Sequence, residues 1–148
     1  MDDVRQCVYA DKGQMEHFDT YPTKALDELV DVDFKIHGCP INGNEFKQIV
    51  RSLLLGKTPV VPDYPVCVEC KQRFTICALH LGQLCLGPIT RGGCNAPCPA
   101  GGLVCLGCRG PAADPNYDEM LALAERHGFQ EREIAERVNF FGAFEGII

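Results

Sequence analysis

Eight of the ten cysteines in this chain lie between positions 67 and 108, and this concentration limits the fold more than any other feature of the sequence. The same stretch, extended to Pro111, contains eight glycines and four prolines. Such a composition leaves few apolar side chains to bury and little room for regular elements, apart from a helical turn expected near 75 to 84. Bound metal must therefore supply much of its stability.

The clustered cysteines divide into two sets of four. Cys-x-x-Cys occurs twice, and two intervening residues let both sulfurs converge on one metal centre. A cubane iron-sulfur cluster needs four thiolates, so eight cysteines suffice for two 4Fe-4S clusters without a borrowed ligand. We therefore predict that all eight bind a cofactor. They are Cys67, Cys70, Cys77, Cys85, Cys94, Cys98, Cys105 and Cys108.

The same count fits other chemistry. Two structural zinc sites, each held by four thiolates, would make the chain an adaptor without redox activity. Disulfides or unligated thiols are a third interpretation, although a reducing cytosol disfavours disulfides. Iron-sulfur clusters are favoured because the gaps between ligands are uneven and because glycine and proline crowd the ligands, so that backbone amides can point at cluster sulfides. The sequence contains no nucleophile triad, phosphate-binding glycine loop or nucleotide fingerprint, so we expect no catalytic residue in this chain.

Ordinary helix and strand patterns flank the cysteine segment. Residues 30–37 alternate apolar and polar side chains, which predicts a half-buried strand leading to Cys39. An apolar stripe predicts a helix over 45–55 with Asn44 as its cap. After the cysteine segment, Asp114 is the expected cap of one helix, and a second helix is expected at about 130–141.

These patterns predict an irregular α+β fold in three parts. Residues 1–58 form a small α/β remnant, residues 59–111 form a loop-rich segment with two iron-sulfur clusters, and residues 112–148 form two helices that clamp it. Proline residues at 59, 62 and 65 mark the first boundary. Cys7 matches no ligand motif, and we expect it to be a small buried side chain.

Composition narrows the range of partners. A hydrophobic fraction of 46% and a charged fraction of 23% are typical of a globular protein. The net charge is -6 and the sequence contains no lysine- or arginine-rich tract, so we expect no nucleic acid partner. The first residues show neither a secretory signal nor a transit peptide, and no stretch is long and apolar enough to cross a bilayer. These features predict a cytoplasmic protein without a membrane span.

Four motifs carry a resemblance to a known family: His37-Gly38-Cys39-Pro40-Ile41, the run from Cys67 to Cys77, the run from Cys85 to Cys94, and Cys105-Leu-Gly-Cys108. They resemble the small subunit of nickel-iron hydrogenases, in particular the cytosolic sulfhydrogenase and methyl-viologen-reducing kinds. The resemblance covers nearly the whole chain. It implies an electron-transfer subunit that relays single electrons through two 4Fe-4S clusters between partner subunits.

The resemblance also implies a ligand set for each cluster. The set implied for the distal-type cluster is Cys67, Cys70, Cys77 and Cys85. The set implied for the medial-type cluster is Cys94, Cys98, Cys105 and Cys108. Classical family members have a histidine at the position of Cys67 and a proline near that of Cys98, and cysteine at both positions fits two all-thiolate clusters.

The chain departs from the family on its amino-terminal side. Family members begin with a flavodoxin-like domain whose cysteines join the residue matching Cys39 in a proximal cluster, and this domain is missing here. Either a second polypeptide completes a third cluster with Cys39, or that cluster is lost. The implied partners are a hydrogenase-type large subunit or a split amino-terminal small-subunit chain, and a flavin or iron-sulfur acceptor subunit.

Overall fold

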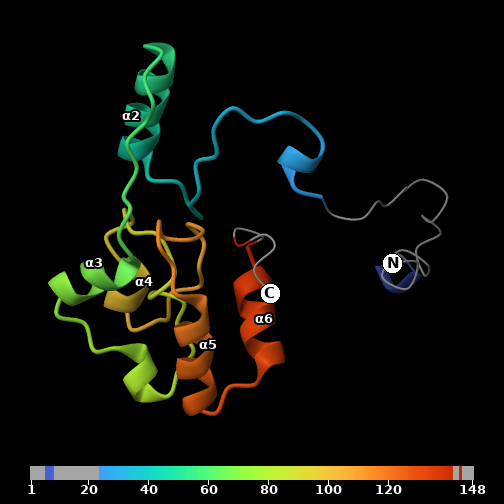
Figure 1. Ribbon diagram of the computed structural model, residues 1–148, viewed down its shortest axis with the longest axis vertical. Coiled ribbons are helices and arrows are strands. Elements are labelled where there is room, and N and C mark those ends of the chain that lie inside the picture. The colour runs from blue at the N-terminus through green and yellow to red at the C-terminus, as the bar shows by residue number, and fades with distance from the viewer. Residues whose placement is uncertain (1–5, 9–23, 142–143, 145–148) are drawn as a thin grey trace. The chain divides into compact units, whose positions relative to one another are not determined.

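The computed structural model describes residues 6–8, 24–141 and 144, which form short helices joined by long loops (Figure 1). The helices are η2 (Leu26–Glu28), α2 (Gly43–Leu54), α3 (Val66–Gln72), η3 (Ala78–Leu81), α4 (Pro97–Ala100), α5 (Tyr117–Arg126) and α6 (Glu131–Asn139). Among the described residues, extended pairing is limited to two isolated bridges, Pro65 with Arg91 and Thr90 with Pro111. None of these helices is long and apolar enough to span a bilayer.

The chain separates into two compact units, Met1–Lys35 and Ile36–Ile148. In the described part of the first unit, Lys35 forms an ion pair with Asp27. The second unit contains the helices from α2 to α6 and all eight clustered cysteines. The division into three parts at residues 58 and 111 stays a prediction.

The strand predicted over residues 30–37 does not form. A strand is held by a ladder of hydrogen bonds to a neighbour, and the described residues offer this segment no partner strand. Val30 and Val32 are 57% and 41% exposed, so the alternating pattern does not correspond to a buried face. The described fold is therefore helical and loop-rich, and the β part of the predicted α+β remnant is not found in it.

Helix α2 begins at Gly43, earlier than the predicted start at residue 45. Its cap is Asn42 rather than Asn44, because the Asn42 side-chain oxygen accepts hydrogen bonds from the amides of Asn44 and Glu45 at 3.0 and 3.2 Å. Gly56 follows the helix with a left-handed φ of 65°, a conformation that glycine adopts without strain.

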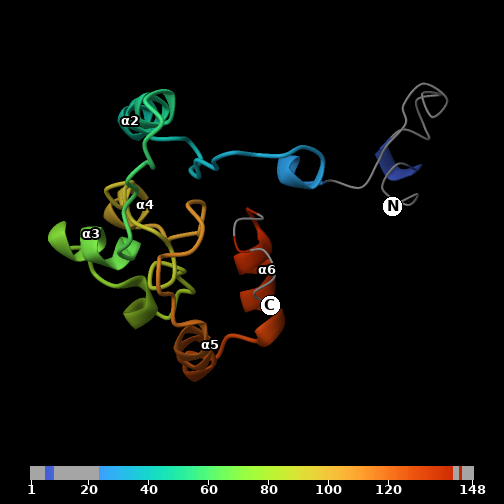
Figure 2. The same cartoon turned by 45° about the horizontal axis from the view of Figure 1, so that its top comes forward.

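The same kind of shift occurs at α5, whose cap is Asn116 rather than Asp114. The Asn116 side chain accepts a hydrogen bond from the Glu119 amide at 3.0 Å. At the start of α6, the Gln130 amide donates to the Glu133 carboxylate at 2.8 Å. The two helices lie side by side in both views (Figures 1 and 2).

Helices α5 and α6 cover the part of the cysteine segment that follows η3. Their buried side chains form one core with residues of that segment. The members of this core are Leu84, Leu86, Ile89, Met120, Ala124, Ile134, Val138 and Phe144. Burying a side chain of this kind stabilises the fold by about 1.5–3 kcal/mol. This core therefore anchors the chain on both sides of Cys85.

Candidate metal centre

Four cysteines line one small cavity of about 30 Å³. This first cysteine group consists of Cys67, Cys70, Cys77 and Cys85. Helix α3 supplies the first two, and their i, i+3 spacing places them on one face of the helix. Cys77 occupies the cap position of η3, and Cys85 follows in a loop. Cys70 and Cys85 are buried, whereas Cys67 and Cys77 are half-buried.

Gly87 lies against two sulfurs of the first cysteine group. A β-carbon added at Gly87 would be 3.2 Å from the Sγ of Cys67 and 3.5 Å from the Sγ of Cys85. Because glycine has no side chain, the space between these sulfurs stays open. A group bound by both sulfurs can therefore approach the backbone closely at this position.

The remaining clustered cysteines line a larger cavity of about 270 Å³. This second cysteine group consists of Cys94, Cys98, Cys105 and Cys108. A sharp turn at Asn95 and Ala96, with left-handed φ values of 63° and 42°, leads into α4. Helix α4 carries Cys98 as an exposed thiol, whereas Cys105 is buried. The eight cysteines thus line two cavities in the sets that the family resemblance implies; their role as ligands stays a prediction.

Cys39 lines the same cavity as the second cysteine group. Its thiol is exposed, and a cis peptide bond joins it to Pro40. One cubane cluster needs four thiolates, so the cavity contains one thiol more than a single cluster binds. The family resemblance assigns Cys39 to a separate cluster, and the structure places it beside the second cysteine group instead of the first.

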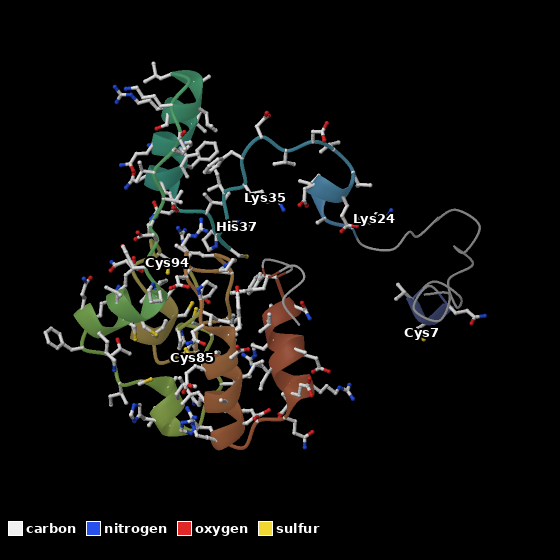
Figure 3. All side chains as sticks on the ribbon, viewed as in Figure 1. Cys7, Lys24, Lys35, His37, Cys85 and Cys94 are labelled. Atoms are coloured by element: carbon white, nitrogen blue, oxygen red, sulfur yellow. The ribbon has the colours of Figure 1, made fainter. Side chains whose placement is uncertain are left out.

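The two groups adjoin at Cys105. Its backbone amide donates a hydrogen bond to the Sγ of Cys85 at 3.2 Å, while its own thiol lines the second cavity. Cys70, Cys85 and Cys105 also share one buried cluster of side chains. Figure 3 shows the labelled Cys85 and Cys94 inside the loop-rich region beside α3 and α4. Groups bound in the two cavities would therefore lie close to each other.

Burial raises the pKa of several of these thiols. Desolvation, followed by the other thiols of its group, raises the pKa of Cys67 to about 12. Burial also raises the pKa of Cys105 to about 12, although hydrogen bonds to its sulfur favour the thiolate. The pKa values of Cys85 and Cys94 lie above the ordinary value for the same reason. A bound cation is what stabilises closely spaced buried thiolates, which fits a metal-binding role.

Glu69 is a buried carboxylate, only 6% exposed, on the helix that supplies two thiols of the first cysteine group. One of its oxygens accepts hydrogen bonds from the Gly93 amide at 2.6 Å and the Tyr64 hydroxyl at 3.2 Å. The other accepts from the Ala96 amide at 3.2 Å and the Cys94 thiol at 3.7 Å. Glu69 therefore ties α3 to the loop of the second group, a role that nothing in the sequence pattern indicates.

A part-buried ion pair also lies beside the second cavity. The guanidinium of Arg109, 4% exposed, donates two hydrogen bonds to the carboxylate of Glu45, at 2.7 and 2.6 Å. Its Nε donates to the Gly92 carbonyl at 2.7 Å. These bonds join the first turn of α2 to the loops around the second cysteine group.

Cys7 is exposed, contrary to the expectation of a buried side chain. In the part of the chain that the structure describes, no group of three or more His, Cys, Asp or Glu side chains is close enough to hold a single metal ion. The thiols of each group instead line a cavity. The second cavity, of about 270 Å³, has space for a ligand of several atoms, whereas the first, of about 30 Å³, must widen to hold one.

No family model matches the chain, but its relatives include hydrogenase subunits. The sulfhydrogenase 2 subunit delta of Pyrococcus furiosus is 43% identical over 119 residues, which cover 80% of this chain and 50% of the relative. A subunit of the F420-non-reducing hydrogenase of Methanothermobacter marburgensis is 29% identical over 146 residues, which cover 78% of this chain and 47% of the relative. An iron-sulfur subunit of the F420-non-reducing hydrogenase of Archaeoglobus profundus is 28% identical over 116 residues, covering 60% and 36%.

The chain spans about half the length of these relatives or less. All three are hydrogenase subunits by name, and the Archaeoglobus protein is named an iron-sulfur subunit. The predicted resemblance to hydrogenase subunits is thus confirmed at that level. The narrower assignment to the nickel-iron small subunit stays a prediction.

Proposed function

We propose that this chain is an iron-sulfur electron-transfer subunit of a hydrogenase-type complex. The first and second cysteine groups each hold one 4Fe-4S cluster, and single electrons pass through them between partner subunits. A bound cluster supplies the redox chemistry, because its iron gains and loses one electron at a time. The residues of this chain hold the clusters, shield them from water and tune their potentials.

The observation that supports this function most strongly is the division of the eight cysteines. Four of the clustered thiols line each cavity, with Cys39 as a fifth thiol at the second, and the two sets agree with those that the family resemblance implies. Cysteine thiolates in sets of four are the usual ligands of 4Fe-4S clusters. The adjoining position of the two groups, through the Cys105 amide and the Cys85 sulfur, suits transfer of an electron from one to the other.

Both groups receive hydrogen bonds at their sulfurs. The Cys85 sulfur accepts from the Cys105 amide at 3.2 Å, and hydrogen bonds also favour the thiolates of Cys94 and Cys105. Such donors favour the reduced, more negative form of a bound cluster. At Cys94, the Glu69 carboxylate opposes additional negative charge, whereas Arg109 favours it.

The partners follow from the relatives and from Cys39. We propose that a hydrogenase-type large subunit, or a split amino-terminal small-subunit chain, binds on one side, and a flavin or iron-sulfur subunit on the other. The exposed thiol of Cys39 is accessible to a second polypeptide that could complete a third cluster. We place the complex in the cytoplasm, where reducing conditions keep the cysteines as thiols.

Iron and sulfide analysis of the complex, purified without oxygen, tests this function. We expect about eight iron and eight sulfide per chain, with two interacting signals in low-temperature electron paramagnetic resonance (EPR) after reduction by dithionite. About twelve of each would mean that a partner completes a third cluster. Zinc without iron would contradict the proposal and favour a structural adaptor.

Single substitutions assign the ligands. Cys70→Ser and Cys105→Ser each remove a buried thiol from one group, and each should lose about half of the iron. Cys7→Ser is the matched control, because Cys7 is exposed and lies outside both groups. Retention of all iron in both ligand variants would contradict the assignment.

A further inference from the structure

Three large apolar side chains stand in solvent on the stretch that connects α3 to Cys85. Phe74, Ile76 and Leu81 are 96%, 71% and 62% exposed. Contiguous exposed apolar patches mark sites of protein contact, and these three side chains fall within eight consecutive residues. The stretch also contains Cys77, a half-buried thiol of the first cysteine group. A partner that contacts this stretch would therefore lie next to the first cavity.

Phe74 is strained and yet contributes nothing to the core. It follows Arg73, the residue that caps the carboxyl end of α3, with a left-handed φ of 55°. Glycine is the usual residue at this position after a helix, because a side chain there meets the backbone. Strain of this kind is typical of functional positions. Contact with another molecule accounts for a phenylalanine that packs against none of its own chain.

The charge of the same stretch is positive. Lys71 and Arg73 are exposed, whereas Glu69, the one acidic residue between positions 66 and 85, is buried. The whole chain has a net charge of -6, so this surface differs from the rest of the molecule. Lys71 also lines the first cavity, and Arg73 is fixed by a hydrogen bond to the Asn95 carbonyl at 3.0 Å. Such a surface attracts an acidic partner.

We propose that a small acidic electron-transfer protein docks on the Phe74 surface, defined as Lys71, Arg73, Phe74, Ile76 and Leu81. The inference rests on the proposed function, because exchange of an electron requires a cluster in the first cysteine group. In the exchange, the reduced carrier loses one electron and the cluster of the first group gains it, with no bond made or broken. The basic residues steer the encounter, and Phe74 provides the apolar contact.

The rate of reduction by a carrier tests the docking surface. The holoprotein is mixed with a reduced acidic two-cluster ferredoxin, and the absorbance of the clusters is followed by stopped flow at increasing salt. We expect the second-order rate constant to fall as salt rises. Phe74→Gly should lower it about tenfold, as loss of a central apolar contact does. Glycine also relieves the strained φ, so its melting temperature should stay equal or rise.

Two further variants define the outcome. Lys71→Glu should slow the reaction and weaken its dependence on salt. Val60→Ala is the control, because Val60 is 93% exposed but lies outside the Phe74 surface; its rate should equal that of the native chain. Equal rates for Phe74→Gly and the native chain, or faster reduction by a basic carrier of the same reduction potential than by the acidic ferredoxin, would overturn the inference.

Iron content, EPR and direct binding separate this inference from the proposed function. Binding is measured by titration with fluorescently labelled ferredoxin, which requires no electron transfer. A native chain without iron would overturn the proposed function, while weaker binding by Phe74→Gly would still support the surface. If the native chain has its full iron content but the Phe74 and Lys71 variants bind ferredoxin as tightly as it does, the docking surface is contradicted and the proposed function stands.

Discussion

The first cysteine group is closed and the second is open. The first surrounds a cavity of about 30 Å³ against Gly87, and the second surrounds one of about 270 Å³ that also includes Cys39. A cluster can enter the first group only when its thiols rotate outward, because little space lies between them. The second group already has space for a cluster.

The difference follows from what holds each group. Most of the first group comes from one short helix and one turn that lie close together in the sequence. The second depends on contacts between distant residues, the Arg109 pair with Glu45 and the bonds of Glu69 to the loop at 93–96. Local contacts form a compact site, whereas distant ones leave a larger cavity between the segments they join. The second group should therefore be the more sensitive to substitutions away from its cysteines.

The largest effect is expected from Glu45→Ala. This change leaves the buried Arg109 guanidinium without its carboxylate and should lower the free energy of unfolding by about 3 kcal/mol. Chemical denaturation without oxygen measures it, and the EPR signal of the second group should change more than that of the first. Glu119→Ala is the control, because its pair with Arg126 is exposed and should matter by less than about 1 kcal/mol. Equal decreases in the free energy of unfolding in the two variants would show that the second cysteine group does not depend on the pair between Arg109 and Glu45.

Glu69→Ala should lower the free energy of unfolding by a smaller amount, about 2 kcal/mol, because the amides of Gly93 and Ala96 lose a buried acceptor. Although Glu69 lies on the helix of the first group, the iron of the second group should become easier to remove by a chelator. Glu69→Gln keeps one acceptor oxygen, so it should lower the free energy of unfolding less than Glu69→Ala does. Faster chelation from the first group would show that Glu69 mainly supports its own helix.

Gly87→Ala should act on the first group alone. Its new methyl group lies 3.2 Å from the Cys67 sulfur, so the sulfurs must shift, at a cost of about 1 kcal/mol. Iron analysis should show partial loss from the first group and none from the second. The control is Gly43→Ala, because no atom lies within 4 Å of the added β-carbon. If the Gly87→Ala variant keeps its full iron content, the first cysteine group has more space than the structure indicates.

The smallest effect on stability, about 0.5 kcal/mol or less, is expected from Cys98→Ser, since Cys98 is exposed. Iron analysis is more informative here. Cys39 lines the same cavity and can replace the lost thiolate, so Cys98→Ser should retain more iron than Cys70→Ser. The double variant Cys98→Ser, Cys39→Ser should lose the second cluster. If Cys98→Ser alone loses that cluster completely, Cys39 is not within reach.

The pairing within each Cys-x-x-Cys motif could be predicted because it depends on local spacing, whereas the two sets of four came from the family resemblance. Two residues between cysteines put both on one face of a turn, whatever surrounds them. The strand over 30–37 was not predictable from its alternation, because a strand also needs a partner and the described residues provide none. Helix α3 was missed because cysteine, with its weak helix preference, fills the positions where an apolar stripe is normally recognised.

Helix caps and buried charged side chains are a second group of features that the sequence alone does not predict. At α2 and α5 two capping residues lie close together, and only the hydrogen bonds in the structure distinguish Asn42 from Asn44 and Asn116 from Asp114. The roles of Glu69 and Glu45 depend on residues 24 and 64 positions away in the chain. A single sequence contains no sign of such contacts, whereas a solvated role is the usual one for glutamate.

The hydrogen bond from Cys105 to Cys85 has a consequence for synthesis on the ribosome. The chain emerges from its amino terminus, and Cys105 follows Cys85 by 20 residues. At about 5–20 residues per second, the first cysteine group waits roughly 1–4 s before its last partner appears. During that interval the Cys85 sulfur lacks the hydrogen bond that the Cys105 amide donates in the folded chain.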